Sequence, residues 1–446
     1  MASDWPTERL GVNCTKIGSG ATPKGGKDAY LPSGPFTLIR SQNVYNEGFN
    51  ASGLAFISPD QAKLLDSVTV EANDILINIT GDSVARVCLA PSWVLPARVN
   101  QHVAIIRTKP DRFDSHYLRY VLISPSQQER LHSLAAVGAT RNALTKGMLE
   151  SLELPRPPLH FQRACAGVLA SLDDRIDLLR QTNITLEAIA QTLFKSWFVD
   201  FDPVRAKAEG REPEGMDTAT AALFPASLKE WWFTFSEHRV QSLVDSKLLV
   251  VGDGYRAKNS ELGSPGVAFL RAGDLLAGRI SPTRDLLSEG ALSAAKGKHA
   301  QPGDTVFTSK GTIGRFAFVP SLLDPVVYSP QVCFWRSVNH TRIAPEYLHF
   351  WMRSSLFSVQ VDRVRGNAAI MDFVSLGDQK AMTLSLPNES IQRRFSEIVR
   401  PLLEKTANNR ATSDSLSELR DTLLPRLISG KTRLPEAESL IKDAVA

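Results

Sequence analysis

The sequence of 446 residues contains little cysteine, no long apolar run and almost no net charge. Its four cysteines form no CxxC pair, so the sequence predicts neither a zinc site nor a disulfide framework. It has no run of about 18 apolar residues and no basic segment followed by an apolar one at its start, so we expect no membrane contact and a cytoplasmic protein. Lys and Arg number 51 against 47 Asp and Glu, so any basic surface for a nucleic acid must be local.

The motifs of common catalytic sites are missing as well. Neither HExxH nor GxSxG occurs, so a metal-dependent or serine hydrolase is not expected. Residues 20–28 resemble a phosphate loop only superficially, because Asp28 stands where Ser or Thr would bind Mg²⁺. Asp202-Pro203 continues into Val204 and fails the tetrapeptide of an amino-methyltransferase. We therefore expect a protein without a catalytic site, a metal or a cofactor of its own.

What the sequence does contain is a second copy of its own pattern. Segments 74–91 and 304–320 can be aligned, and so can 34–44 with 266–276, 100–107 with the segment that ends at Arg336, and 115–124 with 345–354. Gln162 then corresponds to Gln392, and the blocks keep the same order at a spacing of about 230 residues. Chance similarity between apolar strands is the alternative, but five blocks in one order disfavour it.

Both copies follow one plan, in which short β-rich runs separated by Gly, Pro and Asn turns precede a long helical stretch. We expect an α+β fold of two similar mixed α/β domains, two long helices and an internal pseudo-two-fold repeat. The expected boundaries are 1–158 for the first domain, 159–201 for the central long helix, 202–227 for a polar linker, 228–388 for the second domain, 389–430 for the C-terminal long helix and 431–446 for a charged tail that frays.

A heptad pattern runs along the first helical stretch. Apolar residues alternate at spacings of three and four, and Asn183 takes a position where a polar residue fixes the register of a coiled coil. The second stretch is more polar but keeps several leucines in register. The alternative is that each helix only caps its own domain. The predicted seam consists of Leu172, Ile176, Leu179, Asn183, Leu186, Leu193 and Trp197 in the first helix and Leu402, Leu416, Leu423 and Leu427 in the second.

Two similar domains at a fixed separation suit a ligand with two sites, such as double-stranded DNA. Arginine pairs with guanine and amides pair with adenine, whereas lysine more often contacts phosphate. Each residue taken singly is alternatively an ordinary surface or turn residue. Arg86 and Arg315, which the repeat aligns, are expected to form a shared structural ion pair instead. The DNA-contact candidates are Lys24, Lys27, Arg40, Gln42, Asn43, Gln101, His102, Thr140, Arg141 and Asn142 in the first copy and Arg271, Lys310, Thr312, Arg363, Arg365 and Asn367 in the second.

Several segments resemble one known family. Residues 17–24 (IGSGATPK), the strand entries at Asp74 and Asp304, residues 193–201 (LFKSWFVDF) and residues 423–430 (LLPRLISG) look like the specificity subunit of Type I restriction-modification systems. The resemblance implies two target-recognition domains that each read one half of a bipartite DNA site, and two antiparallel helices that set the gap between the halves. The loops of the two copies differ, so we expect an asymmetric target.

The resemblance also implies partners. Two methyltransferase (modification) subunits, which use S-adenosylmethionine, are expected to assemble on the chain, and restriction or translocase subunits that use ATP and Mg²⁺ can join them. Phe194, Phe198 and Phe201 are expected to be subunit-docking aromatics, while Trp197 packs in the seam. Three alternatives stay open: a coiled-coil scaffold that binds no DNA, the recognition subunit of another bipartite phage-defence system, and a fused DNA methyltransferase with an unfamiliar motif.

Overall fold

The structure, a computed structural model, describes residues 5–136, 142–276, 278–281, 285–321, 323–365 and 373–445. The chain forms two compact units. Unit 1 consists of Met1–Leu178 and Thr412–Ala446, and unit 2 consists of Leu179–Ala411. Each unit therefore combines one mixed domain with part of each long helix.

Unit 1 is built on two four-stranded sheets. The first is antiparallel with the order β2-β11-β8-β9, and the second has the order β6-β3-β10-β7 with β3 parallel to β10. Leu76, Val99 and Ile105 contribute to the buried apolar cluster of this unit. The strands are β1 (Thr7–Arg9), β2 (Cys14–Ser19), β3 (Phe36–Ile39), β4 (Val44–Tyr45), β5 (Gly48–Phe49), β6 (Ala55–Ile57), β7 (Thr69–Val70), β8 (Ile75–Asn78), β9 (Val87–Leu89), β10 (Ala97–Val99), β11 (Val103–Thr108) and β12 (Glu153–Pro155), and the short helices are α1 (Pro59–Leu64), α2 (Ser115–Ile123), α3 (Pro125–Ala136) and α4 (Lys146–Glu150).

Unit 2 repeats this arrangement. Its antiparallel sheet has the order β14-β22-β19-β20, and β15 is parallel to β21 as β3 is to β10. The repeat in the sequence is thus a repeat of the fold. The strands are β13 (Phe235–Arg239), β14 (Leu249–Asp253), β15 (Gly266–Leu270), β16 (Leu275–Leu276), β17 (Arg279–Ile280), β18 (Leu286–Ser288), β19 (Thr305–Thr308), β20 (Phe316–Phe318), β21 (Val326–Tyr328), β22 (Val332–Ser337) and β23 (Thr383–Pro387), and the domain's helices are α8 (Leu228–Phe233), α9 (Val240–Asp245), α10 (Pro345–Met352), α11 (Ser355–Arg365) and α12 (Leu376–Ala381).

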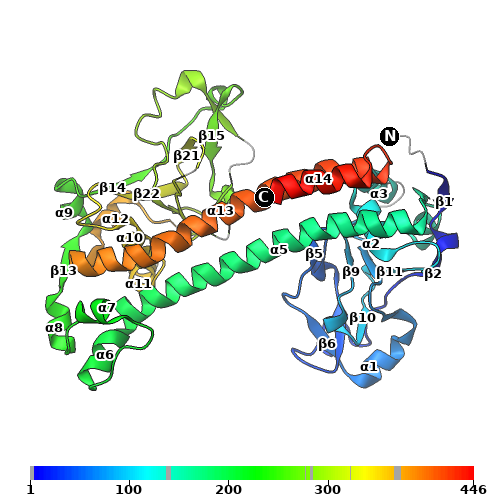
Figure 1. Cartoon of the computed structure of the whole chain (residues 1–446), viewed down its shortest axis with the longest axis horizontal. Helices are drawn as coiled ribbons and strands as arrows, with labels where there is room; N and C mark the ends of the chain where they lie inside the picture. Colours follow the sequence, from blue (N-terminus) through cyan, green and yellow to red (C-terminus); the bar gives the residue numbers. More distant parts are fainter. Residues whose placement is uncertain are drawn as a thin grey trace. The chain divides into compact units, whose positions relative to one another are not determined.

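Two long helices, α5 (Leu159–Lys195) and α13 (Glu389–Ile428), follow the two mixed domains (Figure 1). Within unit 2 they are antiparallel, since Asn183 of α5 bonds to Asn409 and Trp197, further along, packs against Phe395. The residues of the predicted seam are all buried or half-buried. The fold class expected from the sequence, with its internal repeat and its two long antiparallel helices, is confirmed by the order of these elements.

The segment 202–227, expected to be a polar linker, folds onto unit 2 instead. It forms α6 (Asp202–Ala208) and α7 (Thr218–Ala222), and Val204 and Phe224 are buried in the apolar cluster of that unit. The polar composition of the segment reflects its solvent side and hides the few apolar residues that hold it in place.

The tail expected to fray is also helical, because α14 (Leu434–Val445) follows α13 after a short turn. Gly430, with φ of +77°, makes that turn possible, since the left-handed conformation suits a residue without Cβ after the end of a helix. Ala437 of α14 is fully buried. Among the helices of the described residues, none is both long and apolar enough to cross a membrane.

Candidate nucleic-acid interface

In unit 1, four loops that are distant in the sequence meet beyond the end of β8 and the start of β11. The N–H of Ile79 donates to the carbonyl of His102 (2.9 Å), and the N–H of Leu144 donates to the carbonyl of Ile79 (2.8 Å). The Nδ2 of Asn78 donates to the carbonyl of Ser41 (2.9 Å), which brings in the loop after β3. We name residues 40–43, 79–81, 100–102 and 142–144 loop cluster 1.

Unit 2 contains the same framework. The N–H of Ser309 donates to the carbonyl of Gln331 and the N–H of Val374 donates to the carbonyl of Ser309, both at 3.1 Å. The isolated bridge between Lys310 and Phe373 repeats that between Thr80 and Ala143 in loop cluster 1. The N–H of Ser329 donates to the carbonyl of Leu270 (2.9 Å), which brings in the loop after β15. We name residues 271–274, 309–311, 329–331 and 373–374 loop cluster 2.

The two clusters present different chemistry on this common backbone. In loop cluster 1, the Nδ1 of His102 lies 2.6 Å from the Oγ1 of Thr80, and its Nε2 lies 3.0 Å from the Nε2 of Gln101. In loop cluster 2, the ammonium of Lys310 lies 4.6 Å from the centre of the Phe373 ring. The first cluster therefore offers an imidazole with a hydroxyl and an amide, whereas the second offers a cation held over an aromatic ring.

Several DNA-contact candidates of the first copy already have intramolecular roles. Asn43 is fully buried, its Oδ1 accepts the N–H of Arg40 (3.0 Å), and its Nδ2 donates to the carbonyl of Asn50 (2.9 Å). Its assignment to base contact is wrong, because both ends of its amide hold the loop. The guanidinium of Arg40 and the amide of Gln42 both donate to the carbonyl of Gly53.

Three further candidates of the first copy lie at the surface. Lys24, Lys27 and Asn142 are exposed, and the carbonyl of Asn142 accepts the N–H of Gly81 (3.3 Å). Thr140 and Arg141 lie outside the described residues. The framework thus brings Gln42, Gln101, His102 and Asn142 into one cluster, while Lys24 and Lys27 belong to the loop after β2.

In the second copy the candidates are more scattered. Arg271 forms an ion pair with Asp285 and remains partly exposed, and Thr312 is exposed after β19. Arg363 is exposed on α11, which ends at Arg365, a residue of which only the backbone is described. Asn367 lies outside the described residues.

The structure adds Thr80, Gln331 and Phe373, which were not among the candidates. The repeat contained a signal for Gln331, because the alignment that ends at Arg107 and Arg336 places it opposite His102.

An ion pair shared by the two repeats forms elsewhere than expected. Arg107 reaches both oxygens of Asp74 at 2.8 Å, and Arg336 reaches both oxygens of Asp304 at 2.6 Å. The hydrogen bonds that Arg107 donates to Asp74 raise the pKa of the guanidinium, which therefore stays charged. The expectation is wrong for Arg86, whose guanidinium lies over the Tyr45 ring, 4.6 Å from its centre, and it stays a prediction for Arg315.

Two of the expected docking aromatics are core residues. Phe194 and Phe198 are each 2% exposed, and their rings pack against Tyr347 and Phe395 of unit 2. Their assignment as docking side chains is wrong, because α10 and α13 cover both Phe194 at the end of α5 and Phe198 in the π-helical turn Ser196–Asp200 that continues it. Trp197 is buried beside them, while Phe201 is half-buried with its ring 5.4 Å from that of Trp232. Phe201 therefore remains a predicted docking residue.

Comparison with known proteins identifies the first part of the chain. Residues 3–188 match the family described as Type I restriction modification DNA specificity domain. This part of the chain is similar to that family. The specificity domain, as matched, runs from the first strand of unit 1 into α5 and includes loop cluster 1.

The similarity extends beyond the specificity domain. The chain is 27% identical over 350 residues to the MjaIX specificity subunit of Methanocaldococcus jannaschii, covering 76% of this chain and 74% of the relative. It is 26% identical over 360 residues to the HindI specificity subunit of Haemophilus influenzae, covering 71% and 77%. The resemblance to Type I specificity subunits seen in the sequence is thereby confirmed.

A solved structure shows the same fold. The S subunit of a Type I restriction-modification system from M. genitalium superimposes with a TM-score of 0.59 at 17% identity, covering 95% of this chain and 96% of that one. Among the described residues, no three His, Cys, Asp or Glu side chains gather as a metal site requires.

Proposed function

We propose that the chain recognises two different half-sites on double-stranded DNA and brings methyltransferase subunits to them. The observation that carries this proposal is the pair of loop clusters, which share their backbone hydrogen bonds but not their side chains. A common scaffold with exchanged side chains is suited to reading different base edges, since each base pair presents its own donors and acceptors in the major groove. The target is accordingly bipartite and asymmetric.

Affinity comes from contacts other than base reading. Lys24 and Lys27 are exposed in the loop after β2, where they can neutralise phosphates without reading sequence. The long helices α5 and α13 act as the spacer that fixes the gap between the half-sites. A helix of 37 residues, such as α5, is about 55 Å long.

Catalysis in this assembly belongs to the partners. Two methyltransferase subunits carry S-adenosylmethionine, and restriction or translocase subunits with ATP and Mg²⁺ can join them. The chain itself contributes recognition and docking, and among the aromatic side chains open to a partner are Phe201, the exposed Trp232 whose ring contacts it, and the exposed Phe233.

The test is a purification of the tagged chain from its native cell, with the co-purifying chains identified and counted and the methylated bases of the genome mapped. We expect two methyltransferase chains for each copy of this chain and a bipartite, non-palindromic methylated sequence. A palindromic sequence would contradict the asymmetric target. Recovery of no methyltransferase would favour a scaffold, whose binding would lack the steep salt dependence of DNA contacts.

A further inference from the structure

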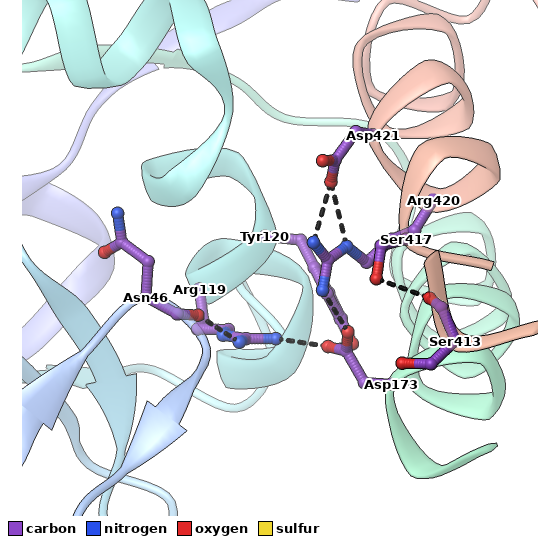
Figure 2. Close-up of polar contacts among 8 residues, drawn as sticks. All are labelled: Asn46, Arg119, Tyr120, Asp173, Ser413, Ser417, Arg420 and Asp421. Atoms are coloured by element: carbon purple, nitrogen blue, oxygen red, sulfur yellow. Dashed lines mark hydrogen bonds and ion pairs between the residues drawn. The ribbon is translucent and has the colours of Figure 1, made fainter. Parts of the chain in front are cut away.

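The two long helices bury polar contacts between them, and in unit 1 these contacts centre on Asp173 of α5. Its Oδ1 accepts from Arg420 of α13 (2.8 Å), and its Oδ2 accepts from Arg119 (2.8 Å) and from the hydroxyl of Tyr120 (2.7 Å), both on α2 (Figure 2). The side chains of Asp173, Arg119 and Arg420 are 17%, 9% and 19% exposed. Burial alone would raise the pKa of Asp173, but the two guanidinium groups outweigh burial and lower it, so the carboxylate is charged.

In unit 2 an ion pair between Arg410 and Glu187, whose side chains are 24% and 22% exposed, joins the two helices, and a more deeply buried contact between them involves amides. The Nδ2 of Asn409 donates to the Oδ1 of Asn183 (2.9 Å), and the Nδ2 of Asn183 donates to the carbonyl of Thr406 (3.3 Å). Both asparagines are buried in the seam. A buried asparagine in a coiled coil costs stability but selects the register and the partner that satisfy it.

The contact between Asp173 and Arg420 and that between Asn183 and Asn409 each join a residue of one repeat to a residue of the other, and neither pair of residue types recurs at the equivalent positions of the repeat. At the repeat spacing of about 230 residues, the counterpart of Asp173 is Leu403 and that of Arg420 is Ala190. Ala190 belongs to the apolar cluster of unit 2, and Leu403 packs against that cluster. The position that holds an ion pair in unit 1 is therefore apolar in unit 2.

This asymmetry distinguishes the correct pairing from its alternatives. If two copies of α5 paired in the same geometry, Asp173 would face Ala190 and Asn183 would face Leu179. If two copies of α13 paired, Arg420 would face Leu403. Each wrong pairing leaves a buried charge or amide without its partner, which costs more than the matched contact contributes.

We propose that these buried polar residues determine which helix pairs with α5, and we call them a pairing code. They make the seam of α5 a binding surface for the helix of the second repeat and not for the helix of another first repeat. Removing the partner of a buried charge is the usual way in which a helix interface rejects the wrong helix. The code keeps one repeat of each kind in every molecule. It does not depend on DNA binding, so it stands or falls separately from the proposed function.

The first test builds the wrong contacts inside the full chain. Arg420→Ala places opposite Asp173 the residue type that the first repeat carries at this position, Ala190. Asn409→Leu likewise places opposite Asn183 the residue type of Leu179. Replacing Asp173 by Leu together with Arg119→His installs the residues that the second repeat carries at those places. We expect each of these three changes to raise the equilibrium constant of urea unfolding at least tenfold, because each removes one partner of a buried polar group and puts an apolar side chain in its place.

Combining the sets tests the code itself. Arg119→His and Asp173→Leu together with Arg420→Ala recreate the apolar pair of unit 2, so we expect the combined variant to lose much less than the product of the separate losses. Asp421→Ala is the control, because it removes only the exposed partner of Arg420 and should change the constant less than threefold. If the unfolding constant of the combined variant rises by the product of the factors measured for the separate variants, the proposal is overturned.

The second test measures the choice of partner directly. A protease site inserted between Glu212 and Pro213 allows the folded chain to be cut, and the nicked protein, which still contains the whole sequence, is unfolded in urea, refolded and weighed by native mass spectrometry. We expect every complex to contain one fragment of each kind.

A second nicked protein, the comparison protein, lacks the pairing code. It carries Arg119→His, Asp173→Leu and Arg420→Ala together with Asn183→Leu and Asn409→Leu. In this protein we expect complexes of two identical fragments to form. Identical pairs in the unaltered protein, or their absence from the comparison protein, would overturn the proposal. If the nicked chain does not refold, the variants of the full chain decide.

Discussion

At the scale of single residues, the repeat is most evident in two glutamines that fasten the long helices to the domains before them. Gln162 is fully buried, its Oε1 accepts the N–H of Asp114 (2.9 Å), and its Nε2 donates to the carbonyls of Pro157 (2.8 Å) and Arg112 (3.1 Å). Gln392 makes the same three bonds, to Ala344, Pro387 and Arg342. One side chain thus satisfies backbone groups on two sides of each domain boundary.

Gln162→Ala should destabilise unit 1 by about 3 kcal/mol, because the buried groups of Asp114 and Pro157 lose their partner. Gln392→Ala should do the same in unit 2. Urea unfolding followed by hydrogen exchange of peptides from each unit measures both effects. The control is Arg163→Ala at the exposed neighbouring position, expected to change stability by less than about 0.5 kcal/mol. Equal effects of Gln162→Ala and Arg163→Ala would refute the role of the glutamine.

Asp173 should make the free energy of unfolding of unit 1 depend on pH in the acid range. Its folded pKa lies below the unfolded value of about 3.9, so its stabilisation is complete above that pH and is lost as the pH falls through the folded pKa. Asp173→Asn should therefore cost about 3 kcal/mol at pH 7 and progressively less below about pH 4. Unfolding at a series of pH values measures the difference, with the exposed Asp421→Asn as control. A difference that stays constant with pH would show that the ion pairs do not stabilise the fold.

At the scale of elements, the sequence predicted features that depend on the spacing of nearby residues. It did not predict features that depend on contacts between distant segments. The heptad spacing from Leu172 to Trp197 located α5 because helical period is a local property of the sequence. The role of Phe198 could not be read in this way, since the residues that cover it come from α10 and α13. The convergence of the loops in cluster 1 likewise depends on the pairing of β8 with β11, which no local pattern encodes.

Phe198→Ala tests the corrected role of this aromatic. Since its ring packs against Tyr347 and Phe395, we expect a loss of about 3–5 kcal/mol in the stability of unit 2. Ile184→Ala on the exposed side of α5, the helix that leads into the turn of Phe198, should cost less than about 0.5 kcal/mol. Urea unfolding monitored by hydrogen exchange in unit 2 distinguishes the two. A stable Phe198→Ala variant that fails only to bind its partner would restore the docking role.

At the scale of the whole molecule, the proposed function assigns one half-site to each loop cluster. The clusters belong to different compact units with their own apolar cores, so a substitution in one should not alter the chemistry of the other. The duplicated backbone framework with different side chains then explains how one chain reads an asymmetric target.

We therefore expect His102→Ala to relax sequence preference in one half of the methylated target and Lys310→Ala to relax it in the other, each by about 1–3 kcal/mol at the affected base pairs. The measurement maps methylated bases in cells that express each variant with its partner subunits. Lys63→Ala, an exposed change on α1 outside both clusters, should leave the target unaltered. Because each cluster is tied to its own unit, a single substitution that relaxed both halves would mean that the two clusters read one common site.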